Sequence, residues 1–253
     1  MKYVYRYTQK FAELYYRKCL NVSSKEKLVS FTFDDAPSSA FQNAGNLLNE
    51  KDSHATYYVA GCFAQNYNLQ TARFQKEDIM KAIDQGHEIA CHTFDHTHAY
   101  DGKGFNQINE DLQTNLNFLR NQFGIDKTQN FSYPFGEQTL ALRKAVSKNY
   151  QSARSINSGI NQGKFDRFNL KSIQLYENSK SIDEINELIE YFNQTGGWLI
   201  FYTHDVEENY SQYGCSENYF KYVLDKCLER KFKIMSIQES LEYIESNKLN
   251  SGK

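Results

Sequence analysis

Short apolar runs alternate with longer segments whose apolar residues recur every three or four positions. Runs rich in β-branched and aromatic residues predict strands at 28–33, 55–60, 87–91, 130–133, 150–156, 172–176, 198–202 and 233–237. Helical spacing predicts helices at 38–48, 77–84, 107–123, 139–148, 181–192, 218–230 and 238–246. Gly86 and Gly124 end two of these helices, and Ser181 with Glu184 forms a capping box at the start of another.

Strand–helix alternation of this kind favours a parallel sheet with helical crossovers. At 253 residues the chain fits one domain over 1–253, a (β/α) barrel or a broken variant of it, with residues 1–27 as an N-terminal extension packing on the barrel. In such barrels catalytic side chains lie at the C-terminal ends of the strands. Asp34, Asp35, His92 and His204 all follow predicted strands.

Composition narrows the possible partners and compartments. The net charge of −2 gives no reason to expect a nucleic-acid or membrane partner, and no apolar run approaches the roughly 20 residues that span a bilayer. The N-terminus has no continuous apolar signal-peptide core, so we expect a cytoplasmic protein. An odd number of cysteines without C-x-x-C pairs argues against a disulfide framework and a structural zinc site: Cys19, Cys62, Cys91, Cys215 and Cys227.

Two features suggest a metal site, although each has an ordinary explanation. Adjacent carboxylates at Asp34 and Asp35 are costly to bury without a cation, but one of them can also cap a helix while the other is solvated. His92 and His96 are four positions apart, which brings two imidazoles onto one side of a turn, but such a segment can also be a polar loop.

Together these features describe a hydrolytic centre. One carboxylate and two imidazoles leave coordination positions open, and a second carboxylate beside them can accept a proton from water. Hydrolysis of an amide also needs a proton donor for the leaving amine, and an imidazole such as that of His204 suits this task near neutral pH.

These segments resemble the polysaccharide deacetylase (NodB-homology, carbohydrate esterase) family, whose fold is a distorted (β/α) barrel. Its T-F-D-D motif is present at 32–35 and its H-[ST]-x-x-H motif at 92–96, and its late motif, an apolar strand before a histidine, is present at 199–204. The resemblance implies Asp34 as general base, Asp35, His92 and His96 as metal ligands, and His204 as general acid. It also implies removal of N-acetyl groups, in some members O-acetyl groups, from sugars.

The chain departs from the family at its third and fourth motifs. Ser132 stands where the family's third motif has an arginine, and the aspartate that tunes the general-acid histidine has no clear match. We hypothesise that Arg154 supplies the missing guanidinium, although a structural arginine is an equal alternative. The backbone N–H of Phe135 remains available as an oxyanion donor.

The expected substrate is a carbohydrate bearing N-acetyl groups. We predict contacts with it from Tyr133, Pro134, Phe135 and Arg154, and stacking from Tyr202 and Tyr213, although each aromatic ring can instead be core packing.

One divalent ion is expected, zinc first, although the same donors accept cobalt, nickel or iron. Two competing interpretations remain. One is a catalytically weak or inactive carbohydrate-binding protein on the same barrel. The other is a non-haem iron oxygenase, which also uses two histidines and a carboxylate.

Overall fold

A curled parallel sheet organises the chain. The computed structural model describes residues 9–65, 70 and 73–250. Its eight-stranded sheet has the order β6-β5-β4-β3-β2-β9-β8, and β10 pairs with β2 next to β3. The strands are β2 (Lys27–Asp34), β3 (Thr56–Val59), β4 (Glu88–Cys91), β5 (Asn130–Ser132), β6 (Ser152–Arg154), β8 (Ile173–Gln174), β9 (Gly197–Thr203) and β10 (Lys233–Ile234). Every pair within this sheet is parallel.

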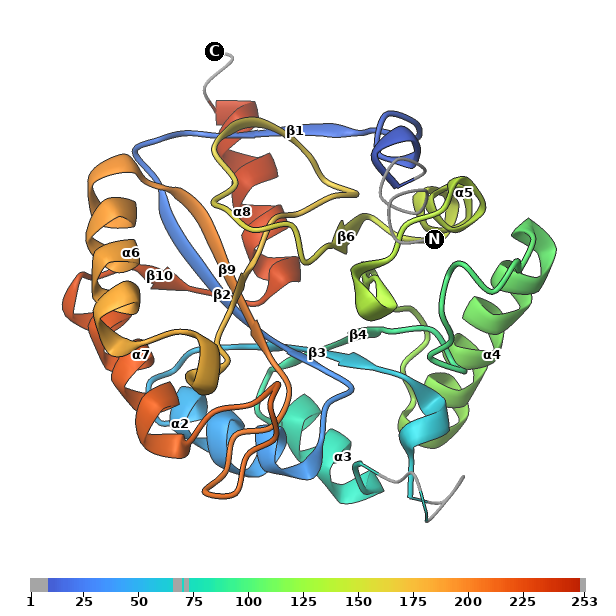
Figure 1. The fold of residues 1–253 in the computed structure, drawn as a ribbon, viewed down its shortest axis with the longest axis horizontal. Coiled ribbons are helices and arrows are strands. Elements are labelled where there is room, and N and C mark those ends of the chain that lie inside the picture. Colours follow the sequence, from blue (N-terminus) through green and yellow to red (C-terminus); the bar gives the residue numbers. More distant parts are fainter. Residues whose placement is uncertain (1–8, 66–69, 71–72, 251–253) are drawn as a thin grey trace.

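Helices surround the sheet. Figure 1 shows α6, α7, α2, α3 and α4 following one another around it. Their bounds are α2 (Gly45–Asn49), α3 (Lys76–Asp84), α4 (Phe105–Phe123), α5 (Leu140–Asn149), α6 (Ile182–Thr195), α7 (Glu217–Glu229) and α8 (Ile237–Asn250). Shorter turns are η1 (Ala40–Ala44), η2 (Gly61–Phe63), η3 (Pro134–Gly136) and η4 (Glu177–Ser179). No helix of the described residues is long and apolar enough to cross a membrane.

Irregular chain bridges the gap between β6 and β8. The N–H of Ala153 donates to Arg167 O at 2.8 Å, the N–H of Leu170 donates to Ala153 O at 2.9 Å, and that of Ser172 donates to Asn157 O at 3.0 Å. The sheet therefore curls toward closure without a regular strand at this point. The architecture confirms the expected distorted (β/α) barrel.

The two faces of each strand have different surroundings. One face of β2 packs against the outer helices through Val29, Phe31 and Phe33. The other face turns inward, where Leu28 joins Trp198 of β9 in a cluster with α8. Because side chains alternate along a strand, the same parity that buries Leu28 directs Asp34 into the barrel at the opposite end.

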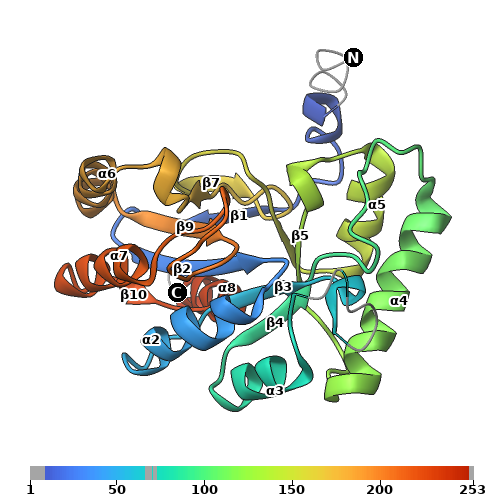
Figure 2. The ribbon, with the colours of Figure 1, turned by 60° about the horizontal axis from the view of Figure 1, so that its bottom comes forward.

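The sequence did not predict every element. A short antiparallel ribbon joins β1 (Cys19–Val22) to β7 (Gly163–Asp166), and neither strand has a strong apolar alternation. The strand predicted at 150–156 is only Ser152–Arg154, because the chain then leaves the sheet to bond with the segment around Leu170. The helix predicted at 38–48 contains the wider π-turn η1. Residues 9–12 are helical and project from the body in Figure 2.

His87, at the base of the barrel, is a buried histidine that the fold holds neutral. Its Nδ1 accepts the Ala55 N–H at 3.1 Å, so Nε2 carries the proton and faces Gly45 O at 3.3 Å. Burial lowers the pKa of His87 to about 4. The folded state therefore resists a proton that the unfolded chain takes up at its ordinary pKa of about 6.5.

Replacement of this histidine tests that assignment. A depressed folded-state pKa contributes stability that is present above about pH 6.5 and is lost as the pH falls toward about 4. His87→Asn keeps a side-chain acceptor but does not titrate. The free energy of unfolding, measured by urea denaturation at pH 7.5 and pH 5, should fall by about 2 kcal/mol more in the wild type than in the variant. Equal pH dependence in the two proteins would contradict a buried neutral His87.

Candidate active site

The ends of β2 and β4 carry the predicted ligands on strained loops. Asp34 is the last residue of β2 and His92 directly follows β4. Positive φ angles occur at Asp35 (57°), His96 (48°) and Phe135 (55°), and the same holds for Ala36 and Thr93 in these loops. Side chains other than glycine rarely adopt this conformation, and it persists where surrounding contacts hold it. The site is therefore built on backbone that the neighbouring packing constrains.

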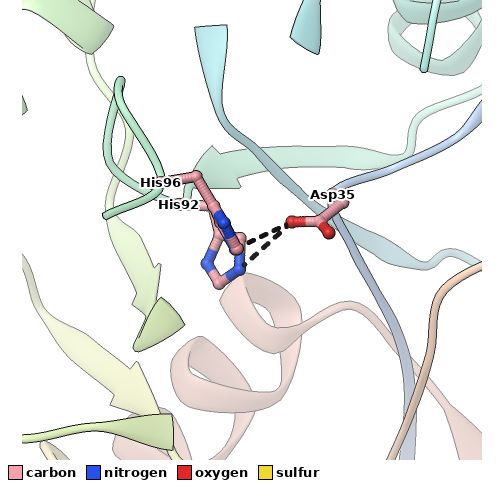
Figure 3. Close-up of side chains that lie close together, drawn as sticks. All are labelled: Asp35, His92 and His96. Atoms are coloured by element: carbon pink, nitrogen blue, oxygen red, sulfur yellow. Dashed lines mark ion pairs between the residues drawn. The ribbon is translucent and has the colours of Figure 1, made fainter. Parts of the chain in front are cut away.

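Asp35, His92 and His96 converge, as Figure 3 shows. Asp35 Oδ1 lies 3.0 Å from His96 Nε2 and 3.6 Å from His92 Nε2. One donor atom from each residue lies within 4.8 Å of the other two. His92 Nδ1 lies 2.9 Å from Ser132 O, and a carbonyl only accepts, so the Nδ1 proton points there and the lone pair on Nε2 faces Asp35.

This donor set fits a divalent cation. Asp35 Oδ1 is buried and has no hydrogen bond of acceptable geometry among the described residues. A buried carboxylate oxygen without a donor is costly unless a cation meets it. Burial alone would raise the pKa of Asp35, but the imidazoles of His96, His92 and His204 outweigh it and hold the pKa below its usual range. Burial lowers the pKa of His92 to about 4, so its imidazole is neutral at neutral pH and free to bind a metal.

Asp34 has a different set of partners. Arg154 donates to Asp34 Oδ1 through a guanidinium nitrogen, and the Ser132 hydroxyl donates to the same oxygen at 3.2 Å. Burial opposes ionisation of Asp34, but the charge of Arg154 and the nearby imidazoles of His92 and His204 lower its pKa below the usual value. Asp34 is therefore a carboxylate at neutral pH.

Arg154 reaches Asp34 from the strand next to the one that carries Ser132. Ser132 on β5 and Arg154 on β6 are paired in the sheet register. A guanidinium from the strand next to that of Ser132 therefore reaches Asp34. The Arg154 side chain is fully buried, with its guanidinium carbon 4.8 Å from the ring centre of Tyr202 and 5.3 Å from that of Tyr58.

His204 follows β9 and faces the ligand set. Its Nε2 lies 4.0 Å from Asp35 Oδ2, and its Nδ1 is buried without a hydrogen-bond partner in the described part of the chain. The neighbouring Asp205 turns away, because its Oδ1 accepts the Ser211 hydroxyl at 2.6 Å. No described carboxylate therefore orients His204 through Nδ1, in keeping with the absent fourth motif.

A cavity of about 510 Å³ opens over these groups. Its walls are formed by Asp34, Asp35, Arg73, His92, His96, Tyr133, Phe135, Gly136, Ile156, Gln174, Tyr176, Tyr202, His204, Ser211 and Tyr213. Phe135, Ile156 and Tyr213 are 46%, 43% and 49% exposed and provide apolar surface there. The cavity is large enough for a small carbohydrate, since ligand sites of this kind occupy about 300–1,000 Å³.

Three predicted substrate contacts have different surroundings. Pro134 lines a smaller neighbouring pocket and Arg154 lies behind Asp34, so neither forms part of the main cavity wall. Tyr133 does line the cavity, but its hydroxyl donates to Phe168 O at 3.0 Å, which fixes it in the protein core. Phe135, Tyr202 and Tyr213 all face the cavity.

Sequence reasoning missed several wall residues. Tyr176 ends the strand predicted at 172–176, so the rule that placed Asp34 and His204 at strand ends would have found it. Gln174 lies within that segment, and Ser211 belongs to an irregular loop after β9. Arg73 precedes α3 and carries no periodic or motif signal, yet one of its guanidinium nitrogens lies 3.4 Å from Asp35 Oδ2.

Known proteins share both sequence and fold with this chain. Over 191 residues it is 22% identical to a bifunctional xylanase/deacetylase of Pseudobutyrivibrio xylanivorans, an alignment covering 69% of this chain and 29% of that protein. Over 128 residues it is 25% identical to a chitooligosaccharide deacetylase of Azorhizobium caulinodans, covering 50% and 57% respectively. The chain thus spans less than two thirds of the length of either relative.

Solved structures extend the likeness over nearly the whole chain. Peptidoglycan deacetylase PdaC of Bacillus subtilis aligns with a TM-score of 0.61 at 14% identity, covering 91% of this chain and 97% of that one. A CE4 family pseudoenzyme of Bacillus anthracis aligns with a TM-score of 0.59 at 12% identity, covering 87% and 67%. These alignments establish the shared barrel fold, which occurs in a protein described as a deacetylase and in one described as a pseudoenzyme.

The match to a family model covers the first two motifs. The model described as polysaccharide deacetylase matches residues 21–152, more than half of the chain. This segment includes Asp34, Asp35, His92 and His96 and ends before Arg154 and His204. The chain belongs to the polysaccharide deacetylase family.

Proposed function

We propose that this protein is a metal-dependent hydrolase that removes N-acetyl groups from an amino-sugar substrate. The observation that carries the proposal is the convergence of Asp35, His92 and His96, whose donor atoms lie within 4.8 Å of one another around the buried Asp35 Oδ1. Family membership supports deacetylation as the reaction type. The names of the curated relatives, a chitooligosaccharide deacetylase and a xylanase/deacetylase, support an acetylated carbohydrate as the substrate class.

The ligand set would hold one divalent ion, with zinc as our first assignment and cobalt, nickel or iron compatible with the same donors. When bound, such an ion lowers the pKa of water and polarises a carbonyl. Asp34 is the base that accepts the proton of the attacking water, because the charge of Arg154 helps to keep it ionised and the contacts with Arg154 and Ser132 fix its orientation. His204, across the site, carries the proton that the leaving amine requires.

The cavity walls support a sugar as the bound group. Phe135 and Tyr213 offer exposed aromatic faces, on which the apolar face of a sugar ring can stack. The backbone N–H of Phe135, in the turn η3 at the cavity wall, is our candidate donor to the developing oxyanion. Its left-handed backbone, held by the turn η3, would fix the direction of that donor.

A second candidate is a carbohydrate-binding protein without hydrolytic activity. Two observations favour it, namely Ser132 in place of the third-motif arginine and the Nδ1 of His204, which has no hydrogen-bond partner among the described residues. The contact between Arg154 and Asp34 weighs against it, because that contact preserves an ionised carboxylate beside the ligand set. The oxygenase interpretation has no support from the family to which the chain belongs.

Metal binding can be tested without a substrate. Protein stripped by a chelator should bind one Zn²⁺ or Co²⁺ per chain in competition with a chromophoric chelator, and the bound ion should raise the melting temperature. Asp35→Asn should weaken binding by more than about 100-fold, since even partners outside the ligand set commonly cost 10–100-fold. Asp95→Asn is the matched control, because Asp95 lies between the two histidines but outside the ligand set. Equal affinity of Asp35→Asn and wild type would rule out this site.

If Asp34 is the base, its replacement should slow the hydrolytic step and leave metal binding intact. Asp34→Asn should lower kcat for acetate release from N-acetylated chitooligosaccharides by about 10²–10⁴-fold, because loss of a positioned base costs that much. The variant should still bind one metal ion per chain. A variant that keeps a tenth or more of the wild-type kcat would exclude Asp34 as the base. Wild-type protein that binds these sugars and the metal but releases no acetate would favour the non-catalytic candidate.

The coupling between Arg154 and Asp34 predicts a specific pattern of stabilities. In metal-free protein, Arg154→Met leaves Asp34 buried without its guanidinium and should lower the free energy of unfolding by about 3–5 kcal/mol. Adding Asp34→Asn removes the uncompensated charge, so the double variant should be more stable than Arg154→Met alone. Strictly additive losses, measured by urea denaturation, would show that the two side chains do not act as a pair.

A further inference from the structure

Arg73 is held on the cavity wall from both sides of its backbone. Its N–H donates to Phe63 O at 2.8 Å, and its carbonyl accepts the Ser38 N–H at 2.7 Å. Its guanidinium carbon lies 4.5 Å from the ring centre of Phe63, and the Phe63 ring is 5.2 Å from that of His96. The side chain is therefore positioned beside the ligand set, although it is 42% exposed.

Among the described residues, the Arg73 side chain has one polar contact, the ion pair with Asp35 Oδ2. Its 3.4 Å length is long for a charge-assisted hydrogen bond. A guanidinium carries five N–H donors in a planar arrangement that matches the oxygens of a carboxylate or phosphate. Since Arg73 lines the cavity, donors remain available to a bound molecule.

The charge balance of the site also favours an anion. Arg154 neutralises Asp34, and Arg73 offsets the charge of Asp35, so the four ionised side chains cancel. A divalent cation held by Asp35 and the two histidines would leave the cavity with surplus positive charge. In a low-dielectric cleft lined by charges of one sign, the electrostatic potential raises the local concentration of ligands of the opposite sign. Arg73 is the only lysine or arginine among the described residues of the cavity wall.

We propose that Arg73 forms a subsite for an anionic group, a carboxylate or a phosphate, carried by the amino-sugar substrate. The inference rests on the proposed deacetylase function and narrows its substrate class to acidic N-acetylated sugars. The proximity of the guanidinium to Asp35 places that group near the reacting centre, on the sugar that is hydrolysed or on its immediate neighbour.

The test compares acidic and neutral substrates of otherwise equal structure. Wild type and Arg73→Gln are assayed for acetate release from N-acetylglucosamine, from its 6-phosphate and from its 3-O-lactyl ether, which bears a carboxylate. The loss of kcat/KM in Arg73→Gln should be about 10–100-fold greater for whichever acidic sugar the subsite accepts than for the neutral sugar, the range expected for a hydrogen bond to a charged group. Lys76→Gln, which removes a positive charge from α3 outside the cavity, is the matched control and should leave the preference unchanged.

Two further measurements show whether Arg73 binds the acidic group or only positions Asp35. They also show whether the subsite exists if the protein does not hydrolyse sugars. Because Arg73 contacts the ligand Asp35, the Zn²⁺ affinity of Arg73→Gln is measured alongside that of wild type, and the sugar assays use zinc concentrations that saturate both proteins. Calorimetric binding of the two acidic sugars to zinc-loaded Asp34→Asn protein, with and without Arg73→Gln, reports the subsite even if no sugar is hydrolysed. Binding of an acidic sugar that weakens on loss of Arg73 supports the proposal. Equal losses for acidic and neutral sugars, or none for either, overturn it.

Discussion

The burial of two adjacent carboxylates at the end of β2 is the constraint around which this end of the barrel is arranged. Asp34 and Asp35 are 5% and 4% exposed, a cost that only cationic or hydrogen-bonding partners can offset. The two residues face different partners. Asp34 meets Arg154 and Ser132 from the inside of the sheet, whereas Asp35, turned by its positive φ, meets the imidazoles and Arg73 at the cavity. Asp34 Oδ1 thus accepts from two donors of the protein, whereas Asp35 Oδ1 lies beside the two imidazoles, where a cation would fit.

This division gives each carboxylate a distinct chemical capacity. A carboxylate held by a guanidinium stays ionised and fixed in direction, as a general base must. A carboxylate that shares space with two imidazoles has the donor set of an open catalytic metal site. Ser132 and Arg154 are register partners on β5 and β6, and both donate to the same oxygen of Asp34.

The positions of residues at strand ends explain how much of the candidate site could be predicted from the sequence. The apolar runs before Asp34, His92 and His204 predicted strands, and the C-terminal ends of parallel strands share one edge, so their convergence followed from local pattern and topology. Arg73 could not be predicted in this way, because its place depends on backbone hydrogen bonds to Phe63 and Ser38 that no periodicity records. The ribbon of β1 and β7 was missed for a similar reason, since its pairing joins segments far apart in the chain with little apolar alternation.

If one divalent cation joins Asp35 to His92 and His96, anomalous scattering from a crystal of zinc-loaded protein, measured on both sides of the zinc absorption edge, will locate it. We expect a single strong anomalous peak about 2.0–2.2 Å from Asp35 Oδ1 and from the Nε2 atoms of both histidines. A zinc-loaded crystal whose anomalous peak lies elsewhere, or that has none at this cavity, would contradict this expectation.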